Sequence, residues 1–457
     1  MDKNTRHIDA SPTKEFFIHI LIRDVFLPYA IGDLIDNCVD GARRIRPNKD
    51  FAGLHIKVNY DAEKFEIEDN CGGIPVEIAE KYAFRFGRPK DMPSTPGSIG
   101  EFGVGMKRAL FKMGSYFSIT SYTENESFSV EVDVEEWKTQ YEEVGVEEGE
   151  PQPEEEYLKK EKWEFDFKEL HTEETNAPEK CGTYIKITKL HDNIIEEFKL
   201  ANFTSRLVEL VRSQQAENIE KGLEIVINNN SLGRSHIQLL QSDQIKPLHT
   251  QKKLEGKTGE IEVRVYAGID EPKLEDSGWY VICNSRLVLK ADKSRLTGWD
   301  DKIADDSKTP KAHYQFARFR GYVYFDSDSP SLVPWNTTKS SVDAESPIYQ
   351  ATKLDMIPAM RQVLEFLNKL DGELDKGETR LENLIKEAKP VRISNITPSP
   401  KFVFPKAGTV SKPRTGKITY ERAAEDITRA KEILGVTTNK EVGEKTFEYF
   451  MSLEAED

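Results

Sequence analysis

Cysteine is scarce in this sequence. Cys38, Cys71, Cys181 and Cys283 are the four cysteines among 457 residues, and no two of them stand at metal-ligand spacing. This usage argues against a disulfide framework and against a cysteine-ligated zinc site, and it predicts a reducing, cytoplasmic location.

Long apolar runs are also missing. No segment approaches the roughly 18 consecutive apolar residues that a membrane helix needs, and the N-terminal stretch lacks the apolar core of a signal peptide. Apolar residues make up 37% and charged residues 32% of the chain. We therefore expect a globular protein with no membrane partner.

Positive charge is in deficit overall but is unevenly distributed. The formal net charge is −16, which disfavours indiscriminate binding to nucleic acid. Residues 135–156 include ten acidic residues and one lysine, whereas residues 389–417 include seven basic residues and no acidic one. The basic stretch is therefore a candidate for phosphate contacts in spite of the total charge.

The length predicts two to three domains. Apolar periodicity indicates an α/β domain over residues 1–215, with an acidic insertion at about 135–175 and a long helix from Ile194, and a second α/β domain over 216–388. Residues 389–418, rich in proline and lysine, predict an extended linker. Residues 419–457 predict two helices broken at Gly435, with a capping box from Thr438 to Glu441.

Three short segments within about a hundred residues carry polar residues and glycines in a specific order: GDLIDNCVDGA, EDNCGGIP and GSIGEFGVGMK. In the first, Asp33, Asn37 and Asp40 fall at i, i+4 and i+7 and so share one face of a helix. The alternative is an ordinary amphipathic helix with a polar outer stripe.

The second and third segments place glycines after a strand and before a helix. Asp69 ends an alternating strand and is followed by Gly72 and Gly73, a pattern that a tight turn alone would also explain. The glycine cluster precedes a helix that is expected to end at Met113, before Gly114. Free N–H groups at such a helix start are suited to holding phosphate, although similar glycine spacings also arise by chance.

Taken together, the three segments resemble the GHKL ATPases, the superfamily of gyrase B, the ninety-kilodalton heat-shock chaperones, histidine kinases and MutL. The resemblance implies an N-terminal α/β sandwich (the Bergerat fold) that binds ATP between helices and sheet under a mobile lid. It implies that Asn37 coordinates the Mg²⁺ that bridges the phosphates, that Asp69 accepts the adenine amino group, and that Gly73 leaves room for the base.

The same resemblance assigns the remaining nucleotide contacts. The amides of Gly100, Gly103 and Gly105 would hold the phosphates, and Thr183, in CGTYIKIT, would support the adenine contact. The further residues expected at the nucleotide are Asp40, Ile74, Val104, Met106 and Lys107.

Two positions depart from the family pattern. Asp33 stands where hydrolysing members carry the glutamate that orients the attacking water. Because general-base geometry is tight, the side chain that is shorter by one methylene predicts an ATPase with slow turnover. Cys71 replaces the first glycine of the usual Asp-x-Gly-x-Gly segment.

The layout most resembles MutL and the MORC ATPases, because a second α/β domain of transducer type follows the ATP domain. In those proteins a lysine from the second domain reaches the γ-phosphate, and Lys339, in VPWNTTKSSVD, is the candidate here. The alternative is a solvated surface lysine. Arg286, in the turn of VICNSRLVLK, is expected to be structural.

Two functions remain open at this stage. The first is an ATP-operated, dimeric clamp that acts on DNA or a DNA-bound partner, with the basic 389–417 stretch contacting phosphates. The second is a nucleotide-gated protein-interaction or chaperone-like module with little turnover and no nucleic acid, in which the basic stretch docks on the acidic region of residues 135–156.

Overall fold

The computed structural model describes residues 12–87, 95–100, 103–143, 159–173, 175–234, 236–300, 310–405, 418–419 and 421–454. The chain divides into two compact units between Phe404 and Pro405. Within the described ranges no helix combines the length and the apolarity needed to cross a membrane.

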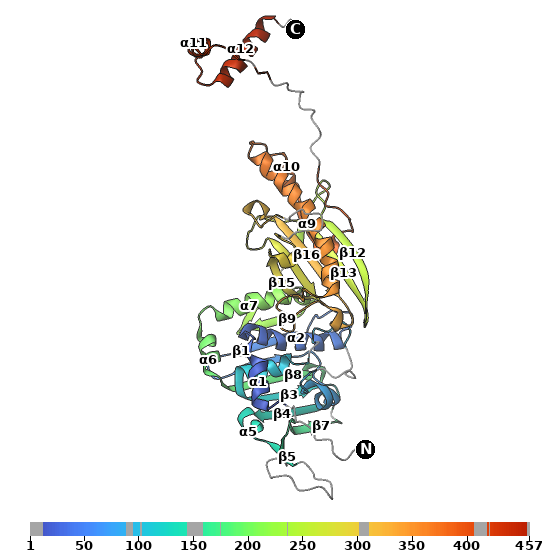
Figure 1. The fold of residues 1–457 in the computed structure, drawn as a ribbon. Helices are drawn as coiled ribbons and strands as arrows, with labels where there is room; N and C mark the ends of the chain where they lie inside the picture. The colour runs from blue at the N-terminus through green and yellow to red at the C-terminus, as the bar shows by residue number, and fades with distance from the viewer. Residues whose placement is uncertain are drawn as a thin grey trace, which may run out of the picture. The chain divides into compact units, whose positions relative to one another are not determined.

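The first unit begins with an α/β layer built on an eight-stranded sheet (Figure 1). Its strands, in spatial order, are β10 (Asn230–Ser231), β9 (Glu224–Ile227), β1 (His55–Tyr60), β2 (Phe65–Asp69), β8 (Gly182–Leu190), β3 (Gly114–Tyr122), β4 (Ser127–Asp133) and β7 (Phe167–His171). Neighbouring strands pair antiparallel except β1 and β9, which are parallel. One short hairpin, β5 (Tyr141–Glu143) with β6 (Lys159–Glu161), lies outside this sheet.

Helices cover this sheet. They are α1 (Lys14–Arg23), α2 (Leu27–Ile45), α3 (Val76–Ile78), a π-helical turn (Ala79–Ala83), α4 (Gly105–Met113), α5 (Val134–Lys138), α6 (Asp192–Lys199), α7 (Phe203–Gln214) and α8 (Ala216–Glu220). α2 starts with Pro28 in its first turn, where proline's fixed φ suits a helix. Its apolar positions recur at three and four residues and are buried, among them Ile31, Leu34, Ile35 and Val39.

Two features of this layer differ from the expectation. The long helix expected from Ile194 is three shorter helices, α6, α7 and α8, separated near Leu200 and Gln215. β9 also lies in the first sheet, beyond the expected boundary at residue 215, because its buried Ile225 and Ile227 complete the core beside β1. Such parallel pairing across long sequence separation has no local signal.

The second α/β region, in the same unit, is a five-stranded sheet in the order β12 (Leu248–Gly256), β13 (Gly259–Ile269), β16 (Phe319–Asp326), β14 (Gly278–Cys283) and β15 (Arg286–Asp292). The long α9 (Pro347–Leu374) packs against β13 and β16, and α10 (Arg380–Glu387) follows it. Along β13 the residues alternate between the two faces, so that Val263 and Val265 join the main core whereas Tyr266 joins a smaller cluster on the opposite face.

The expected linker from residue 389 begins as packed structure. β17 (Lys389–Arg392) pairs with β11 (Gln238–Gln241), and bridges join His249 to Ser399 and Lys246 to Val403. Phe402 is buried against the core. Apolar residues interleaved among the prolines therefore hold this part on the second region, and residues 406–417 lie outside the described residues.

The second unit contains α11 (Ala424–Leu434) and α12 (Asn439–Glu454). Gly435 ends α11 in the left-handed conformation, with φ +62°. The capping box is present, because the Thr438 N–H donates to Glu441 Oε2 (2.8 Å) and the Glu441 N–H donates to Thr438 Oγ1 (3.2 Å). The fold class is therefore as expected: an α/β sandwich, a further α/β region and a helical tail.

Candidate active site

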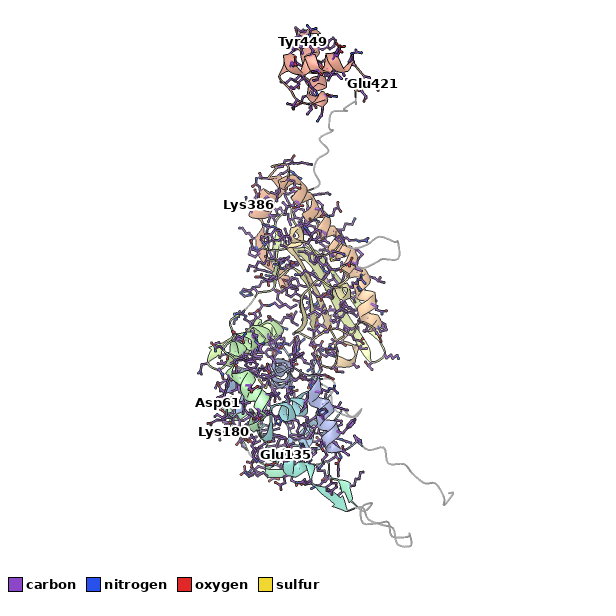
Figure 2. All side chains as sticks on the ribbon, turned by 60° about the vertical axis from the view of Figure 1, so that its left-hand side comes forward. Asp61, Glu135, Lys180, Lys386, Glu421 and Tyr449 are labelled. Atoms are coloured by element: carbon purple, nitrogen blue, oxygen red, sulfur yellow. The ribbon has the colours of Figure 1, made fainter. Side chains whose placement is uncertain are left out.

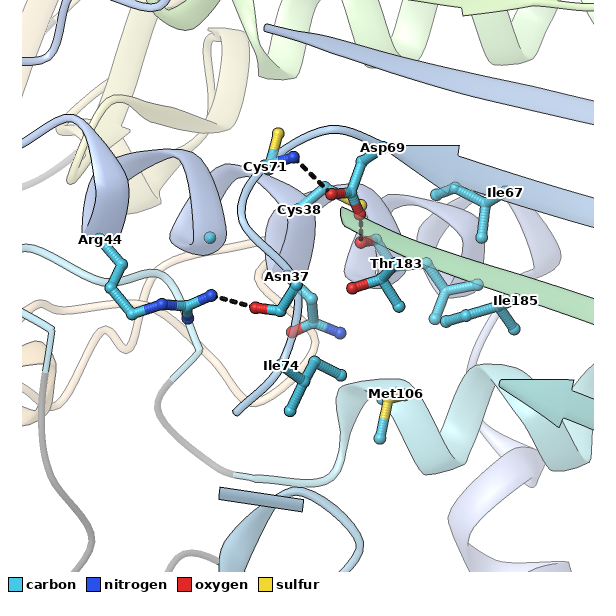
Figure 3. A pocket seen from close by; sticks show the side chains of 13 residues that line it. Asn37, Cys38, Arg44, Ile67, Asp69, Cys71, Ile74, Met106, Thr183 and Ile185 are labelled. Atoms are coloured by element: carbon cyan, nitrogen blue, oxygen red, sulfur yellow. Dashed lines mark hydrogen bonds between the residues drawn. The ribbon is translucent and has the colours of Figure 1, made fainter. Parts of the chain in front are cut away.

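A cavity of about 60 Å³ opens between α2, the ends of β2 and β8, and the start of α4 (Figure 3). Six of the residues expected at the nucleotide line it: Asn37, Asp69, Gly73, Ile74, Met106 and Thr183. They come from all three glycine- and aspartate-bearing segments and from β8. The fold therefore brings together residues that are up to 146 positions apart by number, Asn37 and Thr183.

Asn37 is the exposed position in an otherwise buried stretch of α2. Residues 30–36 and 38–39 are buried, whereas Asn37 is exposed and lines the cavity. One turn further along, a Cβ at Gly41 would lie 2.7 Å from the Cys71 carbonyl oxygen. α2 therefore approaches the turn after β2 closely, and the Asn37 amide is left open to a ligand.

Asp69 is held by the turn that follows it. The Cys71 N–H donates to Asp69 Oδ1 at 2.7 Å. Burial raises the pKa of the Asp69 carboxyl, and this effect outweighs the opposing hydrogen bonds from the Cys71 N–H, the Cys38 thiol and the Thr183 N–H. The carboxylate is thus oriented by backbone donors at the wall of the cavity.

Gly73 is required by the backbone as well as by the cavity. Its φ is +66°, and a Cβ there would lie 2.1 Å from the Tyr122 carbonyl oxygen. The expected reason for this glycine was room for a base. The structure adds a separate one, namely close contact with the end of β3 in a left-handed conformation.

The end of the glycine cluster is bound to Asp40. The Ile99 and Gly100 N–H groups donate to Asp40 Oδ1 and Oδ2, each at 2.7 Å. Burial raises the pKa of the Asp40 carboxyl against the opposing effect of Arg43. The Gly100 N–H, which the resemblance assigns to a phosphate, therefore donates to a carboxylate of the protein itself.

The start of α4 is crowded against α2. Gly103 has φ +64°, Val104 occupies the N-cap position without a side-chain hydrogen bond, and a Cβ at Gly105 would lie 3.2 Å from Cβ of Asp33. Lys107, by contrast, points away from the cavity. It donates to the Ala83 carbonyl (2.8 Å), and burial lowers its pKa to about 7.

Asp33 and Lys339 meet in a buried ion-pair cluster. Lys339 Nζ lies 3.3 Å from Asp33 Oδ1 and 3.1 Å from Asp36 Oδ2. Arg108 of α4 donates to Asp33 Oδ2. Although burial opposes ionisation, Lys339 and Arg108 together hold the pKa of Asp33 below its ordinary value. Lys339 lies in a loop, with φ +50°, and its side chain is 6% exposed.

Asp36 binds the second α/β region to α2. Arg286, at the start of β15, pairs with Asp36 Oδ1, and both side chains are 0% exposed. Gln215 Nε2 donates to the same oxygen at 2.9 Å. The expectation that Arg286 is structural is consistent with this contact, which also places it beside Asp33.

A second tie joins the two regions at the end of the glycine cluster. Asn284, in the β14–β15 turn, donates from Nδ2 to the Ser98 carbonyl (3.1 Å). Arg43 Nη2 of α2 donates to the Asn284 carbonyl (2.6 Å). The backbone that leads into Gly100 is therefore connected to the second sheet.

Several residues of the site were not predicted from the sequence. Arg44 and Cys38 line the cavity, and Asp36 and Arg108 belong to the buried cluster. Helical spacing offered a signal for two of them, because Asp36 stands at i+3 from Asp33 and Arg44 at i+7 from Asn37. Arg108 gave none, since one more basic residue at the start of a helix is unremarkable by pattern.

The first region is an α/β sandwich with a cavity between its helices and its sheet. Residues 26–164 match the family model of histidine kinase-, DNA gyrase B- and HSP90-like ATPases. This segment is therefore a GHKL-type ATPase domain. No curated protein matches the chain.

Proposed function

We propose that this protein binds ATP with Mg²⁺ in the cavity between α2, β2 and β8, and hydrolyses it slowly to ADP and phosphate. The observation that carries the proposal is the exposed Asn37 on a buried stretch of α2, in a cavity whose other wall holds Asp69 and Thr183. The cavity is small beside ordinary ligand pockets of roughly 300–1,000 Å³, so we expect it to enclose only part of the nucleotide.

Each residue has a role that its surroundings suit. Asp69 would accept the adenine amino group, since its carboxylate is already oriented by the Cys71 N–H. Asn37 would hold Mg²⁺, an ion that takes few protein ligands and keeps phosphate and water oxygens. The ion would neutralise phosphate charge there. Phosphate would also take the Gly100 amide, which now donates to Asp40.

Slow turnover follows from the state of Asp33. Both of its oxygens are already engaged, one by Lys339 and one by Arg108. A general base must lie within about 2.6–3.2 Å of the water it orients, and these two ion pairs hold the short Asp33 side chain back from such an approach. We therefore place the coupling between nucleotide and the second region at Lys339.

The test is ATP affinity and turnover, with Mg²⁺, for the wild type, Asp69→Asn and Asn37→Ala. Asp61→Asn, in the exposed turn between β1 and β2, is the matched control, because it removes the same negative charge outside the cavity. We expect both cavity variants to lose ATP binding while the control keeps it. Wild-type affinity in either cavity variant would remove the site assignment.

We further propose a MutL- or MORC-type layout in which two subunits form a nucleotide-gated clamp on DNA or a DNA-bound partner. Lys389, Arg392 and Lys401 of the basic stretch are exposed on the second region and support this proposal. Deleting residues 406–417 removes basic residues but leaves β17 intact, so it tests the effect of positive charge on DNA binding without disturbing the packed strand. Clamp action predicts DNA binding that weakens steeply with salt. It should be reduced by this deletion, which removes four of the seven basic residues, and lost when Lys389, Arg392 and Lys401 are also changed to glutamine.

One observation favours the other candidate, a protein-interaction module without nucleic acid. The described part of the second unit exposes large apolar side chains, among them Phe447, Tyr449 and Phe450 on α12. Figure 2 labels Tyr449 on this helix. Such exposure is typical of partner contacts. Under this proposal, removing residues 418–457 abolishes partner or subunit association, and DNA binding is absent at low salt.

A further inference from the structure

The buried cluster around Asp33 carries an imbalance of charge among the described residues. Two carboxylates, Asp33 and Asp36, face three cations, Arg108, Arg286 and Lys339, and none of these side chains is more than 7% exposed. The neighbouring Asp40–Arg43 pair adds no net charge. A buried excess of one positive charge is unfavourable unless an anion compensates it.

Within the described residue ranges, the same cluster holds buried donors without a partner, and Gln214 Oε1, on the Gly32 side of Arg286, is a buried acceptor without one. Nε of Arg108 and both Nε and Nη2 of Arg286 are buried and have no hydrogen-bond partner within the part of the chain that the structure describes. Buried donors without partners cost free energy. An anion with several oxygens would satisfy both the charge and the donors.

The cluster adjoins the proposed phosphate end of the nucleotide site. Asp33 lies one helical turn before Asn37 on α2, and Gly105, at the start of α4, packs against it. Arg108 is on the first turn of α4, where the helix N-terminus adds positive potential. The nearest anion that the proposed function supplies is the terminal phosphate of the triphosphate.

We propose that Arg108 is a terminal-phosphate ligand beside Lys339, and that it alternates between Asp33 and the γ-phosphate. This inference rests on the proposed function. Without nucleotide, Arg108 and Lys339 both hold Asp33. The γ-phosphate replaces the carboxylate as their partner and leaves Asp33 free to orient water. ADP has no γ-phosphate and leaves Arg108 on Asp33, so Arg108 makes the site favour ATP over ADP.

The experiment compares affinities for a non-hydrolysable ATP analogue and for ADP, with Mg²⁺, in the wild type, Arg108→Gln and Arg295→Gln. Arg295 is 76% exposed and serves as the matched control. A charge-assisted hydrogen bond corresponds to roughly a tenfold to hundredfold change in affinity. We expect Arg108→Gln to lose about that factor for the analogue and nothing for ADP, with no change in the control.

Two results would overturn the proposal: equal affinities in Arg108→Gln and wild type, or an equal loss for both nucleotides, which is the mark of a structural role. Asp33→Asn decides the question independently if Arg108→Gln fails to fold. Removing the competing carboxylate must raise affinity for the analogue and leave ADP unchanged, and an unchanged analogue affinity overturns the proposal. Absence of ADP binding in the wild type would instead contradict the nucleotide site itself.

Discussion

Arg286→Met tests how strongly the buried cluster holds the second α/β region to α2. The change removes the fully buried partner of Asp36. Taking one member from a buried pair generally costs about 3–5 kcal/mol, because the other charge is left uncompensated. Asp36 keeps Lys339 at 3.1 Å and Gln215 at 2.9 Å, and the two carboxylates of the cluster then face two cations. We therefore expect a smaller loss, about 2 kcal/mol, for the charge-assisted hydrogen bond.

The assay is the free energy of unfolding in urea, followed by tryptophan fluorescence. Trp137 reports the first region, and Trp279 and Trp299 report the second. Lys290→Met is the control, since Lys290 pairs with Glu209 between the same two regions but both side chains are nearly half exposed. Exposed pairs contribute at most about 1 kcal/mol.

The double variant Asp36→Asn/Arg286→Met completes the test. The Asp36–Arg286 pair is absent from it and Lys339 still pairs with Asp33, so we expect its loss of stability to be smaller than the sum of the two single losses. If Arg286→Met costs no more than Lys290→Met, or if the double variant is as unstable as the sum of the single ones, the reasoning from burial is wrong.

Three further predictions concern the cavity. Gly182→Ala would place a Cβ 1.8 Å from the Asp69 carbonyl oxygen. We expect this variant to lose about 3 kcal/mol of unfolding free energy and to bind ATP more weakly. Gly233→Ala, in open space, should change neither quantity. Because burial raises the pKa of Asp69, acidification should weaken ATP binding at a pH above the ordinary aspartate pKa of about 3.9. Calorimetric titrations in which ATP affinity stays constant down to about pH 3.9 would contradict this prediction. A raised pKa also means that folding disfavours the ionised carboxyl at neutral pH, so Asp69→Asn should raise the melting temperature of the nucleotide-free protein, and a lower one would show that the carboxylate stabilises the turn.

The sequence predicted the elements that carry the cavity because their signals are local. The spacing of Asp33, Asn37 and Asp40 requires one helix, and the glycines after Asp69 and before Met106 mark the two turns. Lys339 was expected from a loop resemblance, and the structure places it against Asp33 rather than in the open. Its contact with a γ-phosphate stays a proposal.

The ion-pair partners were not predictable, because they depend on which distant elements meet. Arg108 and Asp33 are 75 positions apart, and Arg286 and Asp36 are 250 apart. For the same reason, the sequence did not predict that β9 belongs to the first sheet or that residues 389–405 pack on the second α/β region. Helical and strand periodicity states which side of an element is buried, but not which element buries it.

The cluster has a thermodynamic consequence that links stability to nucleotide binding. Lys339 bridges Asp33 and Asp36, so it belongs both to the contact between the two regions and to the proposed phosphate site. If the γ-phosphate draws Lys339 from Asp36, ATP weakens that contact by some free energy. Reciprocity then requires that weakening the contact strengthens ATP binding by the same amount. A substitution that loosens this contact without touching Lys339 or Arg108, such as Asp36→Asn, should therefore tighten ATP binding even as it lowers stability.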